Sequence, residues 1–164
     1  MKKLQLLFIA MTSMASSMMS YAQEKGDTVS LPTVTVTSVR HVDSRLNRAF
    51  RRAFPHAQDL QWYRQDKDYL AKFIKDDLRH QALFKKNGYI QYDIGYGLAH
   101  HLTQDMGYRV TELYKGYVIT YVAKVTRNSE VFWIINLEGI KDFVIVRLEQ
   151  DSLQEVRRID KAEN

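Results

Sequence analysis

The segment from Asp43 to Trp62 constrains the fold of this chain more than any other part of its 164 residues. Asp43 or Ser44 can accept hydrogen bonds from the free N–H groups of a first helical turn. Pro55 ends such a helix because it disfavours the α conformation at the residue before it. Between these limits the apolar residues recur with helical spacing, at Leu46, Ala49, Phe50, Ala53 and Phe54. The segment therefore predicts an amphipathic helix that leads directly into a strand ending at Trp62.

Residues 1–22 have the three parts of a secretory signal peptide. Lys2 and Lys3 form a basic start, residues 4–15 are mostly apolar, and residues 20–22 (Ser-Tyr-Ala) form a small-x-small cleavage site. The apolar run is too short and too often interrupted by hydroxyl residues to span a bilayer. We therefore expect cleavage after Ala22 and a periplasmic or secreted protein that is not an integral membrane protein.

The composition excludes several classes of function. Loss of the leader removes two lysines and lowers the formal charge from +5 to +3, which is too small an excess for a nucleic-acid-binding protein. The chain has no cysteine, so it can form no disulfide, thiol nucleophile or zinc–thiolate site. Stability has to come from packing in a single domain.

Residues 23–42 are expected to form an extended N-terminal arm. Valines alternate with threonines from residue 33 to residue 37, which is typical of a strand. The arm is either a flexible leader or a strand that pairs with this domain's own sheet or with the edge of a partner's sheet.

Two successive units follow the arm. In the first, residues 43–96, the helix precedes four strands predicted at 58–64, 68–75, 78–86 and 89–94, with a turn at Asn87-Gly88. In the second, residues 97–159, we predict a helix at 98–106 and strands at 108–114, 117–126, 130–137 and 140–149, with a short closing strand at 153–159.

An internal repeat would relate these units. It matches Trp62 to Tyr114, Tyr69 to Tyr117, Phe73 to Tyr121, and Phe84 to Ile135, at offsets of 48 to 52 residues. The predicted fold class is α+β: one domain, residues 43–164, built of two tandem helix-plus-four-stranded antiparallel meander units. Together they would form one sheet of about eight strands with the helices on one face.

The sequence resembles the PepSY-like family of exported bacterial proteins, which is also similar to the β-lactamase-inhibitor-protein (BLIP-like) fold. The resemblance lies in F-x-x-A-F-P-x-A at residues 50–57, Trp62, Y-x-x-x-F at residues 69–73, and the later Asn87-Gly88 turn. It implies an α+β module in the periplasm or outside the cell, without catalytic activity and with binding or inhibitory roles.

No residue pattern indicates an enzyme or a cofactor. The chain has no G-x-S-x-G elbow, no S-x-x-K motif and no glycine-rich phosphate loop. His101 and Asp105 have i,i+4 spacing, but two ligands from one helix do not make a metal site, and we expect a solvated polar face instead. His41, His56 and His80 stand alone and are expected to be surface or packed residues.

The strands of the second unit are apolar on both faces, whereas a sheet covered by helices on one face should alternate with polar residues. Either the arm covers the second face, or that face binds a protein partner or a second copy of the chain. We favour a non-enzymatic binding module that uses the helix-free face. The candidate contact residues are Lys72, Thr120, Lys124, Phe132, Ile134 and Val144, placed opposite Tyr69, Phe73, Tyr121 and Trp133.

The alternative is an envelope-associated protein that binds anionic lipid or another small anionic ligand. Arg45, Arg48 and Arg52 lie along the polar side of the first predicted helix and are its candidate residues.

Overall fold

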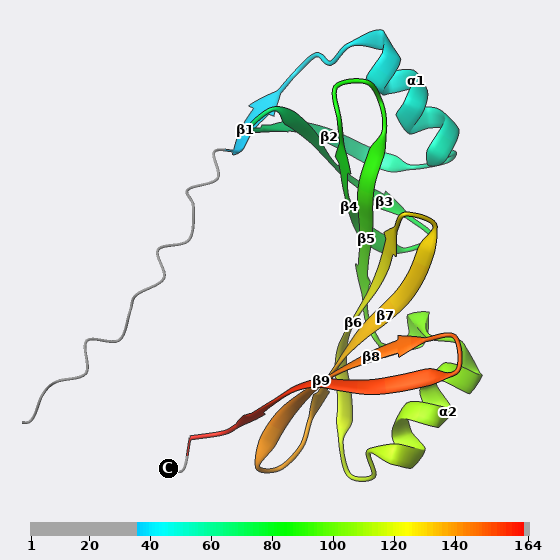
Figure 1. Cartoon of the computed structure of the whole chain (residues 1–164), viewed down its shortest axis with the longest axis vertical. Coiled ribbons are helices and arrows are strands. Elements are labelled where there is room, and N and C mark those ends of the chain that lie inside the picture. Colours follow the sequence, from blue (N-terminus) through cyan, green and yellow to red (C-terminus); the bar gives the residue numbers. More distant parts are fainter. Residues whose placement is uncertain (1–35, 163–164) are drawn as a thin grey trace, which may run out of the picture. The chain divides into compact units, whose positions relative to one another are not determined.

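The computed structural model describes residues 36–162 as one nine-stranded antiparallel sheet with two α-helices (Figure 1). The strand order follows the chain order, so every strand pairs with the next one along the sequence. The α+β class and the antiparallel meander are confirmed. The predicted signal peptide and most of the predicted arm lie outside the described residues.

The elements follow one another in a simple order. They are β1 (Val36–Val39), α1 (Ser44–Ala53), β2 (Gln58–Gln65), β3 (Asp68–Lys75), β4 (Leu78–Phe84), β5 (Ile90–Gly97), the short 3₁₀ helix η1 (Ala99–His101), α2 (Gln104–Leu113), β6 (Val118–Arg127), β7 (Glu130–Glu138), β8 (Asp142–Glu149) and β9 (Ser152–Asp160). β1 comes from the end of the predicted arm and pairs with β2, which is why the sheet has nine strands rather than about eight.

Helix α1 begins and ends where the sequence predicts. The Asp43 side chain accepts a hydrogen bond from the Arg45 backbone N–H at 2.7 Å, which caps the first turn. At the other end the Phe54 N–H donates to the Phe50 carbonyl at 2.8 Å, and Pro55 follows. Arg51 and Arg52 lie in the last turn, where positive charge is favourable to the helix dipole.

The prediction for residues 98–114 was wrong. Only Ala99–His101 are helical before Leu102, and residues 108–113, which were predicted to start a strand, belong to α2. Thr103 caps α2 by accepting a hydrogen bond from the Met106 N–H at 3.3 Å. Gly107, which directly follows the helix predicted at 98–106, lies inside α2, where a glycine is tolerated at a modest cost in stability.

The predicted repeat correspondences were also wrong. α2 begins at residue 104 and α1 at residue 44, while β6 begins at 118 and β2 at 58, so the matching elements are 60 residues apart. Tyr114 therefore corresponds to Phe54, each being the residue that caps its helix, and not to Trp62. The strand residue that corresponds to Trp62 is Val122, and both are buried.

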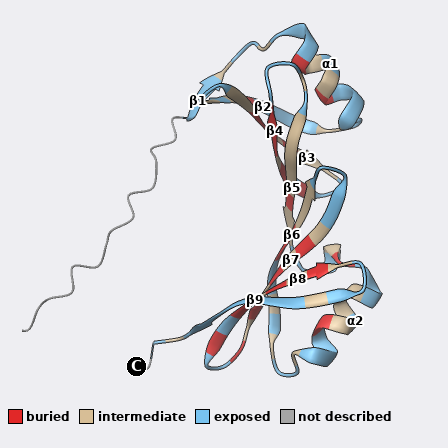
Figure 2. Cartoon of the chain, viewed as in Figure 1, coloured by how far each residue is buried: buried red, intermediate tan, exposed pale blue. Residues whose placement is uncertain are grey.

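Two apolar cores lie on the same face of the sheet. The first core packs Leu46 and Phe50 of α1 against strand residues of β2–β4, namely Trp62, Ala71, Phe73, Ala82 and Phe84. The second core packs Leu102 and Val110 of η1–α2 against residues of β6–β8, namely Val122, Trp133, Ile135, Leu137, Val144, Val146 and Leu148. Figure 2 shows these buried positions as red segments along the strands and on the helices.

A single row of paired residues joins the two cores. It runs from Phe73 through His80, Gly95, Lys124 and Trp133 to Leu148, one residue from each of β3 to β8. Directly opposed residues of neighbouring antiparallel strands point to the same face. Because Phe73 belongs to the first core and Trp133 to the second, both helices cover one face, as predicted from the sequence.

Candidate binding surface

The face of the sheet opposite the two helices, called the open face below, carries a broad apolar surface across β5–β8. Its members follow from the strand register and are Ile94, Tyr96, Tyr121, Val125, Phe132, Ile134, Phe143 and Ile145. Each of these side chains keeps part of its surface accessible to solvent. The two-sided apolar pattern of the second unit therefore has a structural counterpart: one side fills the second core, and the other side forms this surface.

Tyr121 belongs to the open face and not to the core, which corrects its predicted position. A register shift between Ile119 and Tyr121, where β6 pairs with β7, moves the following residues to the other side. Tyr121 is 40% exposed and stacks against Tyr96, with ring centroids 6.0 Å apart. The exposed aromatic surface continues to Phe143, which is 41% exposed.

Cations surround this apolar surface. The Arg147 guanidinium lies 4.0 Å from the centre of the Phe132 ring, and the Lys161 ammonium lies 4.7 Å from that of Phe143. Both cations also pair with carboxylates, Glu149 and Glu138 respectively, at 2.7 Å. Lys72, Arg79 and Arg157 share the open face, and within residues 36–162 no ion pair is recorded for them.

Of the six candidate contact residues, some lie on the open face and others do not. Lys72, Phe132 and Ile134 lie on the open face, as predicted. Thr120 lies in the β6 bulge, is exposed, and donates its hydroxyl hydrogen bond to the Asn136 carbonyl at 3.2 Å.

Two predicted contact residues are on the wrong face. Val144 pairs with Leu137 and is fully buried in the second core, because β8 alternates with its even-numbered residues pointing toward α2. Lys124 pairs with Trp133 and therefore lies on the helix-covered face. The error at Lys124 came from using Tyr121 as a marker for the core, since the bulge shifts the alternation of β6.

The described part of the arm extends the sheet. Val36–Val39 pair with residues 62–65 of β2, so these four residues occupy the sheet's edge. For residues 36–39 the second interpretation of the arm, a strand that pairs with this domain's own sheet, is therefore correct.

The arginines of the alternative hypothesis are all accessible. Arg45, Arg48 and Arg52 are exposed on α1, whose buried residues are Leu46 and Phe50. Within the described part of the chain the structure records no ion pair for any of the three.

His80 is a core histidine that makes one strong contact. Its Nδ1 lies 3.0 Å from both carboxylate oxygens of Asp93, and its ring stacks on Phe73 with centroids 4.9 Å apart. Its Nε2 is buried and has no hydrogen-bond partner among residues 36–162. A catalytic histidine of the serine-protease type would need a hydroxyl at that nitrogen, so the His80–Asp93 pair lacks the third member of such a triad.

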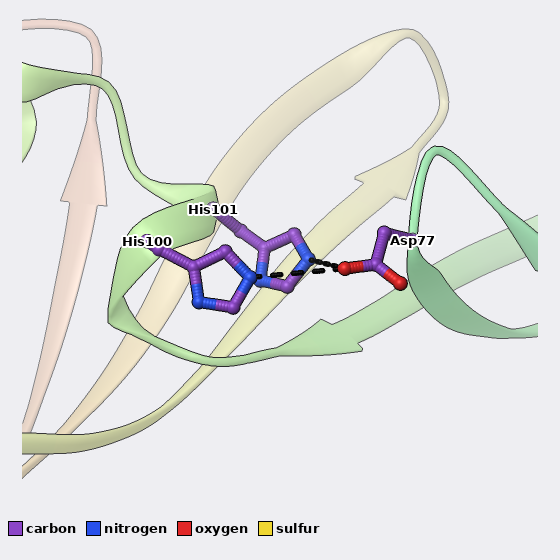
Figure 3. Close-up of side chains that lie close together, drawn as sticks. All are labelled: Asp77, His100 and His101. Carbon is purple, nitrogen blue, oxygen red and sulfur yellow. Dashed lines mark ion pairs between the residues drawn. The ribbon is translucent and has the colours of Figure 1, made fainter.

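Asp77, His100 and His101 gather at one point, and sequence reasoning missed this cluster (Figure 3). Asp77 lies in the turn between β3 and β4, while the two histidines end η1. The sequence pairing of His101 with Asp105 fails because the two residues belong to different helices, η1 and α2. The useful signal was the Asp76-Asp77 turn, but its distance in sequence from the histidines hides the contact.

A buried carboxylate holds the end of the second unit together. Asp142 is 8% exposed, accepts a hydrogen bond from the Tyr117 hydroxyl at 2.9 Å, and pairs with Arg158 of β9. Burial alone would raise the pKa of Asp142, but the Tyr117 and Arg158 hydrogen bonds outweigh it and hold this pKa below its ordinary value.

The fold and this surface define an α+β domain with one helix-covered and one open sheet face. No family model matches the sequence, and no curated protein matches it either. The fold is similar to the crystal structure of a BLIP-like protein from Bacteroides fragilis, with a TM-score of 0.61 and 15% identity over 77% of this chain and 92% of that one.

Two further crystal structures have the same fold. A DUF2874 family protein from Bacteroides uniformis has a TM-score of 0.57 and 11% identity over 73% of this chain and 90% of that one. A protein from Bacteroides eggerthii, provisionally described as periplasmic, has a TM-score of 0.56 and 10% identity over 73% and 89%. The resemblance to BLIP-like proteins is therefore confirmed at the level of the fold.

Among the described residues, no helix has the length and apolar character needed to cross a membrane.

Proposed function

We propose that this protein is an exported, non-enzymatic binding module whose open face binds a protein partner. The observation that carries the proposal is the apolar surface of β5–β8, which lies on the face that neither helix covers. Exposed aromatic and aliphatic side chains that gather on one surface are typical of protein–protein interfaces. Inhibition of the partner would follow if this surface covers a functional site of that partner.

The charges around the open face indicate what kind of partner fits. Lys72, Arg79 and Arg157 have no recorded carboxylate partner within residues 36–162, so their charges are available to another molecule. An apolar surface with a basic rim is complementary to an apolar patch with an acidic rim. We expect such a partner in the bacterial envelope, because residues 1–22 have the pattern of a cleaved signal peptide.

We also propose that the domain consists of two related tandem units. Each α-helix precedes four antiparallel strands, and both the helices and the first strands after them start 60 residues apart, which supports two related tandem units. In this interpretation Lys72 and Arg79 of the open face come from the first unit, and Arg157 comes from the second unit together with most of the aromatic side chains.

The test compares neighbouring residues of β7 that point to opposite faces. Phe132→Ser combined with Ile134→Ser removes two large apolar side chains from the open face. Val131→Ser is the matched control, because Val131 is 45% exposed and lies on the helix-covered face next to Phe132 in sequence. The purified proteins would be used as bait in envelope extract, and captured proteins would be identified by mass spectrometry.

A partner retained by the wild type and by Val131→Ser, but lost with the double variant, supports the proposal, provided that far-UV circular dichroism shows all three folded alike. Equal capture by the double variant and the control contradicts it. Sedimentation equilibrium of the same three proteins tests whether a second copy of the chain binds the open face instead. A dimer formed by the wild type and by Val131→Ser, but not by the double variant, would show that the open face serves self-association.

A second function is favoured by the exposed arginines of α1, for which no ion pair is recorded among residues 36–162. Arg45, Arg48 and Arg52 could attract lipid headgroups or other polyanions, and such attraction weakens steeply with salt. Binding to vesicles containing anionic lipid, measured at low and high salt, tests it. Arg45→Gln with Arg48→Gln should abolish salt-sensitive binding, and binding to neutral vesicles of the same size would contradict it.

A further inference from the structure

We propose that Asp77, His100 and His101 form a binding site for a divalent transition-metal ion of the zinc type. The site is independent of the open face and of any protein partner. It would join the turn between β3 and β4 to η1, and Asp77 and His100 are 23 positions apart in the sequence.

The three side chains converge through atoms that bind metals. The Asp77 Oδ2 atom lies 3.8 Å from His100 Nε2 and 3.6 Å from His101 Nε2 (Figure 3). All three ligand atoms lie within 4.8 Å of one another. Tetrahedral zinc with bonds of about 2.0–2.1 Å places its ligand atoms about 3.3–3.4 Å apart. The two distances from Asp77 Oδ2 to the histidines therefore need to shorten by only a few tenths of an ångström.

The accessible members of the cluster can make this adjustment. The side chains of Asp77 and His100 are 87% and 63% exposed, so neither is held tightly by packing. His101 is the fixed member, with a side chain that is only 11% exposed. Its ring packs against Gly97, where a Cβ atom would lie 2.6 Å from His101 Nδ1.

His101 also has the surroundings that metal-binding histidines use. Its Nδ1 accepts a hydrogen bond from the Leu98 N–H at 3.0 Å and lies 3.2 Å from the Leu98 carbonyl. In the tautomer that instead donates from Nδ1 to the Leu98 carbonyl, the lone pair of Nε2 is free and faces Asp77. A backbone contact of this kind is the usual way of orienting a histidine ligand. That Nε2 atom is buried and has no hydrogen-bond partner among residues 36–162, and a metal ion would satisfy it.

The donor set selects the class of metal. Two imidazole nitrogens and one carboxylate oxygen suit Zn²⁺ and neighbouring first-row ions, whereas Ca²⁺ and Mg²⁺ prefer sites made of oxygen alone. Three protein ligands leave a fourth position of a tetrahedral ion open to water or to an external ligand. Because only the folded chain brings Asp77 to the histidines, a bound metal would also stabilise the fold.

The test is calorimetric titration of the purified, untagged protein with ZnCl₂, beside three variants. Asp77→Asn keeps the turn, since asparagine tolerates the positive φ of +60° at this position, but weakens the ligand. His100→Gln changes an exposed side chain and should leave the fold intact. The matched control is His41→Gln with His56→Asn, which removes two exposed histidines outside the cluster.

We expect one zinc ion per chain for the wild type and the control, and a loss of affinity of about tenfold or more in Asp77→Asn and in His100→Gln. Zinc should raise the melting temperature of the wild type and the control, and raise it much less in the two site variants. The visible spectrum of Co²⁺ added in place of zinc should show tetrahedral coordination.

Three results would overturn the proposal: no zinc binding by the wild type, equal binding by the wild type and both site variants, or loss of binding in the control. Equal binding would mean that the zinc sits elsewhere on the chain. Since circular dichroism can establish that His100→Gln is folded, its result stands even if Asp77→Asn fails to fold.

Discussion

Two glycines of the second unit allow a test of the backbone conformation around α2, because they differ in conformation while neither is closely packed. Gly107 lies inside α2, and Gly116 follows the same helix with φ +84°. A Cβ atom built on either residue meets no other atom within 4 Å. Replacement by alanine therefore changes no packing at either position. The two substitutions should alter stability with opposite signs, because alanine suits a helix and disfavours a positive φ.

The expected magnitudes follow from these conformations. Gly107→Ala should raise the free energy of unfolding by about 0.4–1 kcal/mol, since alanine favours the helix and restricts the unfolded chain. Gly116→Ala should lower it by about 1–2 kcal/mol, the usual cost of a left-handed conformation for a residue with a Cβ atom. For a urea m-value of about 2 kcal/mol/M, the first change moves the midpoint upward by roughly 0.2–0.5 M and the second downward by roughly 0.5–1 M.

Equilibrium urea unfolding followed by tryptophan fluorescence measures both changes, since Trp133 is buried in the second core. If both variants are destabilised, residues 104–113 do not form the continuous helix described here, and residues 108–113 would return to the strand predicted from the sequence. If both are stabilised, the positive φ of Gly116 is wrong.

Two other predictions concern the second unit. Val144→Ala should cost about 1.5–3 kcal/mol, because Val144 is fully buried, whereas Ile145→Ala on the open face should cost clearly less; equal urea midpoints would place both residues on equivalent surfaces. Asp142→Asn should make stability less dependent on pH. Since the folded pKa of Asp142 lies below the unfolded value of about 3.9, its carboxylate contributes fully above that value and the contribution is lost as pH falls toward the folded pKa. Urea unfolding at pH 6 and at pH 3 should therefore show the wild type approaching the variant in acid, and a difference that stays constant would remove Asp142 from this role.

The first unit was predictable because its local signals agree with one another. Asp43 at the start, Pro55 at the end and the spacing of Leu46 and Phe50 all indicate the same helix, and the structure contains it. The strands of this unit follow from clear alternation, as in β3, whose predicted limits of 68 and 75 match those observed. Propensity, periodicity and capping favour the same structure here, so no tertiary information was needed.

The second helix was missed because its signals conflict. Gly107 resembles a helix terminus, and the aromatic and β-branched residues that follow it favour a strand when considered alone. Packing decides otherwise, since burial of Val110 and Met106 against the second core stabilises residues 104–113 as a helix. Local preference is weak compared with the burial of an apolar helix face.

The facing of Tyr121 and the Asp77 cluster depend on information that a single sequence does not contain. A one-residue bulge in β6 reverses which side chains face the helices, and nothing in residues 118–127 marks its position. The contact of Asp77 with His100 and His101 depends on where the β3–β4 turn ends relative to η1. Both are consequences of strand register, which is set by the assembled sheet.

Under the proposed function, residues that stabilise the fold and residues that bind the partner lie on opposite faces of the sheet. Both helices bury their apolar residues on one side, so the free energy of folding comes mainly from that side. Phe132 and Ile134 remain partly exposed on the other side, and their apolar surface is still available to be removed from water by a partner. Because Trp133 between them belongs to the second core, β7 places open-face and core side chains on alternate residues. Under the proposed function, substitution of Phe132 or Ile134 should therefore weaken binding of the partner, and substitution of Trp133 should destabilise the fold.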